Sequence, residues 1–302
     1  MHPKQESIHE RSIDVNQKKD LSIVNCIATA LLAYFFTIPV HEFFHLLTYM
    51  IYGAELKWYS AGAVDAYIES YESMPMFHRI MAAGGSASIL NAIIGIILLI
   101  ILLNVSMGPV PRLFLTQLMG AHLSVGIGYF MIGGFFGAGD WGNVFSYMTD
   151  APGVVTALRI ILSVIGGLGI VVVFFILNHM SYYFIEDCTN KREKLSVAFK
   201  LHLLMLIIGY PVGIIVTLLS PAMKSGELSL GLGLLYNMMW VPFFWGFMFT
   251  GVMNVFPPKK SRFLFKLPAK PNWILLIIGI ALILVDICIF GPGINFGLYN
   301  EK

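Results

Sequence analysis

Two histidines and a glutamate lie close together early in the chain, within the stretch IPVHEFFHLLTYM at Ile38–Met50. His41 and His45 are four residues apart, so on a helix they share one face and can offer two imidazole nitrogens to one metal ion. Glu42 stands beside them, where it can accept a proton from a water that the metal activates. This spacing predicts a catalytic zinc site with His41 and His45 as ligands and Glu42 as general base, and we expect one Zn²⁺ per chain.

A catalytic zinc ion typically takes three protein ligands and a water, so a third ligand is required. Asp140 is the best candidate, because it is the only acidic residue in the glycine-rich stretch GGFFGAGDWGNV at Gly133–Val144. Glycines let the backbone turn sharply or approach closely there. The alternative for Asp140 is an aspartate that caps a helix or a turn. His122 and Asp150 are weaker candidates for the third ligand.

The composition places these residues in a membrane protein. The chain is 57% hydrophobic and 12% charged, whereas a soluble domain carries about 25% charged residues. We therefore predict an all-α polytopic membrane protein whose surroundings are the lipid bilayer. The net charge of +2 gives no indication of a nucleic-acid partner, and the three widely spaced cysteines predict neither a disulfide framework nor a cysteine metal site.

Seven apolar segments are long enough to be membrane-spanning helices, which need about 20 residues each. They cover residues 21–52, 80–104, 112–137, 154–180, 198–220, 229–255 and 272–291. Pro39 should kink or loosen the long first span just before the histidines. Between the first two spans, Glu55–Ser70 alternates partly and is broken at Ser60-Ala61-Gly62, which predicts a β-hairpin. Residues 1–20 form a polar N-terminal tail.

The lysines and arginines indicate the orientation, because short cytoplasmic loops are rich in them. With the N-terminus inside, the inner segments hold 14 of these residues and the outer segments hold 4. We therefore expect a cytoplasmic N-terminus. The two halves of the proposed site, at the far ends of the first and third spans, then face the outer side together.

With these features the chain resembles the site-2 protease family, the intramembrane zinc metalloproteases. That family has a core of three transmembrane helices, in which the first carries HExxH, a β-rich segment follows, and an aspartate near the third completes the metal site. The same order appears here over residues 21–150. The resemblance implies that His41, His45 and Asp140 bind zinc, that Glu42 is the base, and that the substrate is a transmembrane or membrane-associated protein.

Two departures from the family pattern concern individual residues. Asn91, in AAGGSASILNAIIG, matches the asparagine of the family motif Gly-Pro-x-x-Asn, but the Gly-Pro pair is missing. We predict that Asn91 binds substrate, with an interhelical hydrogen bond as the alternative. Asp140 follows Gly-Ala-Gly instead of the usual Asn-Pro…Leu-Asp-Gly context.

The resulting expectation is an intramembrane endopeptidase that hydrolyses peptide bonds in or next to transmembrane segments. The alternative is a metal-binding transporter or receptor-like membrane protein without proteolytic activity. Residues 151–302 would add four helices of unknown role, in which Arg159 and Asp286 could form an ion pair. The hairpin could offer a strand edge to an unwound substrate segment.

Overall fold

The computed structural model describes residues 21–69, 71–185, 188, 190–226, 228–253 and 267–296. Within these residues, seven helices are long and apolar enough to cross a membrane. They cover Ile23–Ile51, Met76–Asn104, Pro109–Phe136, Pro152–Ile185, Lys191–Leu219, Leu230–Met253 and Trp273–Phe290. The predicted positions of the helices are confirmed. The largest difference is in the fifth, which begins at Lys191 instead of residue 198. The predicted tail, residues 1–20, lies outside the described residues.

The first span is broken just before the histidines. It consists of α1 (Ile23–Phe35), whose N-terminus is capped by the Ser22 side chain, and α2 (Ile38–Ile51). Pro39 occupies the first turn of α2, where its missing N–H costs nothing because no intrahelical partner exists there. The predicted effect of this proline is therefore confirmed, and the interruption falls at residues 36–37.

A small sheet follows α2. Strands β1 (Glu55–Ser60) and β2 (Ala63–Tyr67) pair antiparallel, which confirms the predicted hairpin, although its last residue, 70, lies outside the described residues. A third strand, β3 (Ile294–Asn295), comes from the end of the chain and pairs with the other edge of β1. The order β2-β1-β3 leaves β2 as an edge strand.

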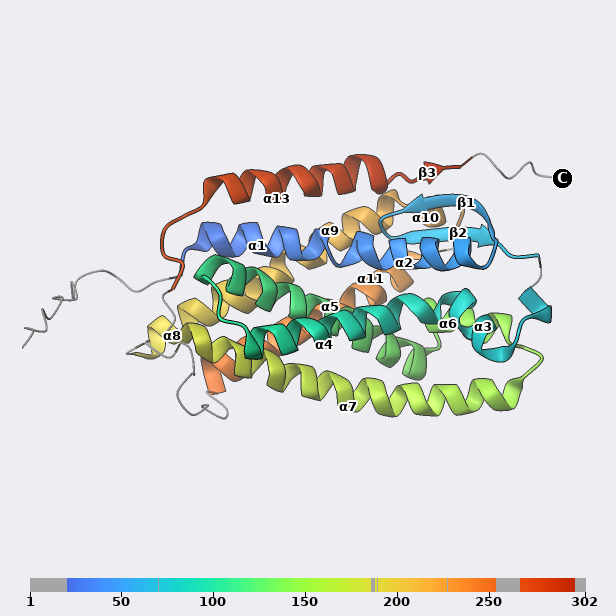
Figure 1. Cartoon of the computed structure of the whole chain (residues 1–302), viewed down its shortest axis with the longest axis horizontal. Helices are drawn as coiled ribbons and strands as arrows, with labels where there is room; N and C mark the ends of the chain where they lie inside the picture. Colours follow the sequence, from blue (N-terminus) through green and yellow to red (C-terminus); the bar gives the residue numbers. More distant parts are fainter. Residues whose placement is uncertain are drawn as a thin grey trace, which may run out of the picture.

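The long helices run side by side, with the sheet at one end of the bundle (Figure 1). Helix α5 (Pro109–Phe136) is the central one, because 72% of an 18-residue apolar stretch within it is buried. The corresponding share is 22% for α7 (Pro152–Ile185) and 17% for the span that begins with α13 (Trp273–Val285). The last two therefore present most of their apolar surface outward, as lipid-facing helices do. The other main helices are α4 (Ser86–Asn104), α9 (Leu204–Leu219), α11 (Leu230–Asn237) and α12 (Val241–Phe247).

Short helices close the two ends of the bundle. Helices α3 (Met76–Ile80) and α6 (Gly139–Tyr147) lie at the end that carries the sheet, and α8 (Lys191–Ala198) lies at the opposite end (Figure 1). The four-residue α10 (Pro221–Lys224) follows α9. A π-helical segment, Met81–Gly85, joins α3 to α4.

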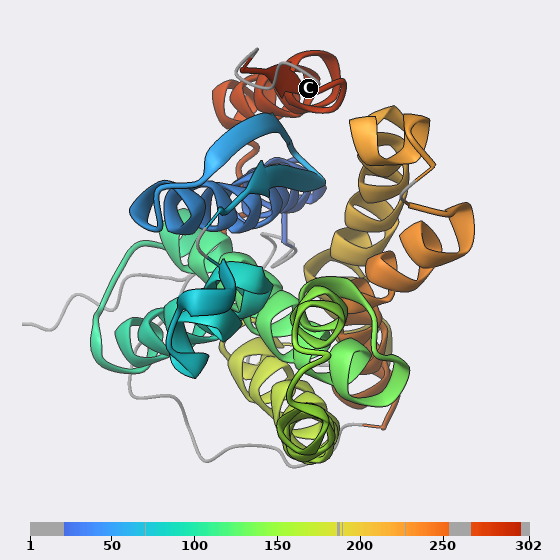
Figure 2. The same cartoon turned by 90° about the vertical axis from the view of Figure 1, so that its right-hand side faces the viewer.

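The predicted ion pair between Arg159 and Asp286 is wrong. Helix α7, which carries Arg159, packs on α5, whereas α13, which leads into the segment of Asp286, packs on α1, so the two helices lie on different sides of the bundle (Figure 2). The Arg159 guanidinium lies over the Phe145 ring, 6.0 Å from its centroid. Asp286 is fully buried, and within the part of the chain that the structure describes neither of its carboxylate oxygens has a hydrogen-bond partner.

Candidate metal centre

Helix α2 presents His41, Glu42 and His45 to the interior of the protein. The two histidines are one helical turn apart, and their ring centroids lie 4.9 Å from each other with the ring planes nearly perpendicular. All three side chains are buried, at 1%, 5% and 7% exposure. Three polar side chains buried on one short helix need partners nearby, because unpaired polar groups are costly in an apolar interior.

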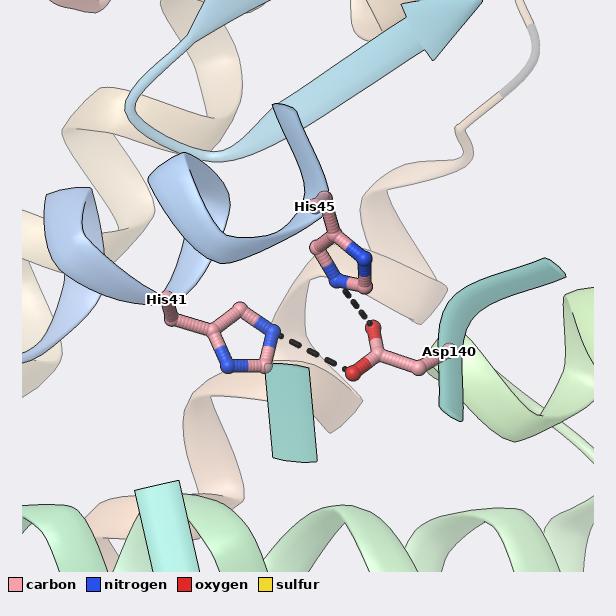
Figure 3. Close-up of side chains that lie close together, drawn as sticks. All are labelled: His41, His45 and Asp140. Carbon is pink, nitrogen blue, oxygen red and sulfur yellow. Dashed lines mark ion pairs between the residues drawn. The ribbon is translucent and has the colours of Figure 1, made fainter. Parts of the chain in front are cut away.

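Asp140 provides the partner for both histidines. Helix α5 ends at Gly137, which has a left-handed backbone, and a second left-handed glycine, Gly139, begins α6. This double turn brings Asp140 back toward α2, and Figure 3 shows its carboxylate facing both imidazoles. Nε2 of His41 lies 3.2 Å from Oδ2 of Asp140, and Nε2 of His45 lies 3.4 Å from Oδ1.

The distances fit a metal ion held among these three residues. One ligand atom from each residue can be chosen so that all lie within 4.8 Å of one another. Atoms bound to tetrahedral zinc at about 2.0–2.2 Å are roughly 3.3–3.6 Å apart, close to the separations seen here. Nε2 of His41 and Oδ2 of Asp140 are buried and face each other as an ion pair, and neither has a hydrogen-bond partner among the described residues. A buried His-His-Asp group whose ligand atoms lie this close together could therefore hold a metal ion.

The electrostatics keep Asp140 in the form that binds a metal. Burial favours the neutral carboxylic acid, but the neighbouring His41 and His45 stabilise the carboxylate more strongly. The pKa of Asp140 consequently lies well below its usual value. The carboxylate is thus ionised throughout the physiological pH range.

Contacts on both sides of Asp140 fix its position. The backbone N–H of Gly139 donates to the hydroxyl of Tyr236 in α11 at 3.2 Å. The indole Nε1 of Trp141 donates to Oγ of Ser88 in α4 at 3.0 Å. The segment from Gly139 to Trp141 is therefore held by two helices besides α5, which places the carboxylate on rigid elements.

Glycine 84 allows the backbone of Asp140 to come close to the α3–α4 connection. Its φ of 138° is one that residues with a side chain rarely adopt. A Cβ at this position would lie 2.8 Å from the Asp140 carbonyl oxygen, which is too close for a real contact. The sequence therefore needs glycine at position 84 for two independent reasons.

Glu42 lies beside the ligand group without belonging to it. Together with His45 and Asp140 it lines a cavity of about 300 Å³, whose walls come from the hairpin, α5, α6 and the segments around α10 and α11. The cavity is large enough to hold water next to Glu42. The arrangement matches what general-base chemistry needs, namely a carboxylate next to the ligands and open to reactants.

The other residues singled out from the sequence have different surroundings. Asp150 pairs with Arg79 through two contacts of 2.7 and 2.8 Å and therefore does not join the His-His-Asp group. His122 does not join it either, because its Nδ1 contacts the side chain of Asn91 at 2.6 Å. Asn91 is fully buried and also contacts Nδ1 of His41 at 2.5 Å, so the interhelical hydrogen bond, left open as an alternative, is present. Its role in substrate binding stays a prediction.

Two tyrosines near the site were not indicated by the sequence. Tyr129 stacks on the His41 ring, with centroids 4.8 Å apart and planes 9° from parallel. Tyr236 holds the backbone at Gly139 and lies in the same cavity wall as Tyr129. Both sit in apolar runs that read as ordinary membrane helix, so only the packing of α5 and α11 against the site reveals them.

Comparisons of the chain with protein-family models, with curated proteins and with solved structures give no match. The function of the chain is therefore inferred from the residues and their geometry.

Proposed function

We propose that the chain is a zinc-dependent intramembrane endopeptidase that resembles the site-2 protease family. The observation that carries this proposal is the position of Glu42, which shares a cavity with His45 and Asp140 but is not one of the three grouped ligands. A site built only to bind or carry a metal has no need of a carboxylate held next to the ligands and open to a cavity. A hydrolytic site needs one.

In the proposed reaction His41, His45 and Asp140 would hold the zinc. A bound zinc ion would lower the pKa of a water towards about 7 and polarise the scissile carbonyl. The carboxylate of Glu42 accepts a proton from the attacking water and donates it to the amide nitrogen that leaves. Tyr129 restricts the His41 ring through stacking, so this imidazole keeps its orientation while the substrate binds.

The proposed substrate is an extended segment of a membrane protein. A transmembrane helix has its amides hydrogen-bonded internally, so it must unwind before its peptide bonds can react. Among the described residues, β2 lies at one edge of the sheet with no strand paired to its outer side, and residues of β2 line the cavity at Glu42. A second cavity, of about 520 Å³, continues from the first past Tyr49, Ala66 and Tyr147, which line both. An unwound segment adding to β2 as a further strand would pass through both cavities.

The charge distribution supports an orientation with the N-terminus in the cytoplasm. The 14-to-4 bias of Lys and Arg then places the His-His-Asp group towards the outer face. The three-helix unit at residues 21–150 forms the proposed metalloprotease core, and later helices pack against its α1 and α5.

The rival function is a metal transporter or a receptor-like metal-binding protein. A transporter needs ligands along a path across the membrane. Within the described residues, a single group of three or more His, Cys, Asp or Glu side chains could hold a metal, and it lies at the sheet end of the bundle. This concentration at one point favours catalysis over transport.

The decisive experiment compares wild-type protein with Glu42→Gln after reconstitution in liposomes. Both would be incubated with a panel of single-span transmembrane peptides carrying a fluorophore and a quencher, and zinc content would be measured in parallel. Because Glu42 neighbours the ligands without being one, the variant should keep about one zinc per chain but lose cleavage. Glu55→Gln, the same substitution at an exposed position of β1, is the matched control and should cleave normally.

Either of two results would overturn the proposal. Cleavage by Glu42→Gln at a substantial fraction of the wild-type rate would show that Glu42 is not the base. Zinc transport into liposomes by wild type, with no peptide of the panel cleaved, would favour the rival function.

A further inference from the structure

The side chain of Asn91 bridges two histidines in the interior. In α4, Nδ2 of its amide lies 2.5 Å from Nδ1 of His41, and Oδ1 lies 2.6 Å from Nδ1 of His122 in α5. Turning the amide by half a turn about its last torsion exchanges these two atoms and moves nothing else. The roles of donor and acceptor are therefore set by what lies beyond the two histidines.

Beyond His122 lies a backbone carbonyl. The carbonyl oxygen of Phe36, at the break between α1 and α2, faces the His122 ring and favours a proton on it. Since Nδ1 of His122 faces Asn91, the donor to Phe36 is Nε2. A carbonyl oxygen can only accept, so this Nε2 must carry the proton. The break that Pro39 imposes thus supplies a fixed acceptor at one end of the chain of contacts.

This fixed end determines the direction of every other hydrogen bond. His122 is buried, and no carboxylate of the described residues acts on it, so it is neutral and has a single N–H. Its Nδ1 is then an acceptor and requires the NH₂ of Asn91. The amide oxygen consequently faces His41, whose Nδ1 must donate to it. The opposite amide orientation would set a bare Nε2 of His122 against the Phe36 oxygen, two acceptors face to face.

We propose that Asn91 and His122 are positioning residues that hold His41 in the tautomer required for metal binding. With the proton on Nδ1, the lone pair of Nε2 points at the group formed with His45 and Asp140. Metal-binding histidines are commonly fixed in this way, by a hydrogen bond from the nitrogen that does not bind the metal. The inference rests on the metal site of the proposed function but not on its peptidase activity.

The test measures zinc affinity of the purified chain by competition with a chromophoric chelator, in wild type and four variants. Asn91→Leu removes the acceptor and should weaken zinc binding by about 10–100-fold. Asn91→Asp keeps an acceptor toward His41 and should bind within a few-fold of wild type. His122→Phe leaves the amide free to turn and should weaken binding in the wild-type background. The substitution His122→Phe should have no effect in the Asn91→Asp background, because either orientation of a carboxylate presents an oxygen to His41.

The spectrum of bound Co²⁺ provides a second readout, because it reports the geometry of the ligands independently of affinity. Asn91→Asp should keep the wild-type absorption, and Asn91→Leu should alter it. Circular dichroism of each variant shows whether the helices persist, and the rescue by aspartate separates positioning from a loss of folding.

The possible failures are distinguishable. If wild type binds zinc and Asn91→Leu binds it equally well, the proposed positioning of His41 by Asn91 is wrong, but the proposed metal site is still supported. If Asn91→Asp loses zinc as completely as Asn91→Leu, or if His122→Phe acts equally in both backgrounds, the hydrogen-bond direction is wrong. If wild type binds no zinc, both the proposed positioning of His41 and the proposed function are wrong. If wild type binds zinc but has no peptidase activity, only the proposed function is contradicted, and the positioning of His41 is not.

Discussion

Replacing Gly84 by alanine tests whether the approach of the α3–α4 connection to Asp140 sets the metal site. An alanine Cβ would lie 2.8 Å from the Asp140 carbonyl oxygen, 3.2 Å from its Cα and 3.3 Å from its carbonyl carbon. All three are backbone atoms, so no flexible side chain can move aside. The Gly84→Ala variant must therefore displace the backbone of a proposed ligand.

The size of the effect follows from these contacts. Ordinary van der Waals contact begins at 3.4 Å, so the carbonyl must retreat by about 0.6 Å. Sites tolerate errors of roughly 0.5 Å in the position of their side chains. The backbone conformation at position 84 adds about 1–3 kcal/mol of strain for any residue with a side chain. We expect zinc affinity to fall by about 10–100-fold, as when a supporting contact is lost, and thermal stability to fall by a few degrees.

The assay measures zinc affinity and the midpoint of thermal unfolding side by side. Gly53→Ala is the matched control, because Gly53 also has a positive φ, of 69°, but has no atom within 4 Å of an added Cβ. The control should lose some stability through strain and keep its zinc affinity. If Gly84→Ala binds zinc as tightly as Gly53→Ala, the close approach to Asp140 does not position the ligand.

Three further predictions concern the third ligand, the metal and the orientation. Asp140→Ala should lose both zinc and activity, whereas Asp150→Ala should keep both because Asp150 pairs with Arg79; emptying of the site by Asp150→Ala would reverse the assignment. Chelation of the metal should lower the thermal midpoint of wild type, because a ligand present at 100 times its Kd stabilises the fold by about 2.7 kcal/mol, and should leave Asp140→Ala unaffected. With the native cysteines replaced, Ser225→Cys should react with a membrane-impermeant thiol reagent on intact cells. Ser261→Cys, outside the described residues, should not, and the reverse pattern would place the site at the cytoplasmic face.

The features predictable from the sequence are those fixed by local rules. Hydropathy sets the positions of the helices, because each must cover a hydrocarbon layer about 30 Å thick. The spacing of His41 and His45 sets their common face whatever surrounds them. Asp140 was identified because few acidic residues occur near the far end of the third span, and the structure brings it within 3.2–3.4 Å of both histidines.

The features that the sequence could not reveal depend on how the helices pack. Asn91 and His122 each read as a lone polar residue in a span, and their contact requires α4 and α5 to lie side by side in one register. Strand β3 has only two residues, too few for an alternating pattern, and it forms because β1 offers it an edge. Such pairings join residues distant in the chain, which no local pattern encodes.

The same packing brings residues from the later half of the chain into the site. Tyr236, from α11, fixes the backbone next to Asp140, and Ala222 and Leu228 complete the wall of the cavity at Glu42.

At the opposite end of the bundle, the Asn25 side chain ties the start of α1 to the segment before α13. It donates to the carbonyls of Pro268 and Lys270, each at 2.9 Å, and accepts from the N–H of Asn272 at 2.8 Å. The span that follows leads into β3, which extends the sheet at the edge opposite to β2. A core consisting of residues 21–150 alone would therefore lack the hydroxyl that holds Gly139, part of the cavity wall and one strand of the sheet. For this reason we expect the proposed peptidase to need its whole bundle, with the boundary at residue 150 running through the site.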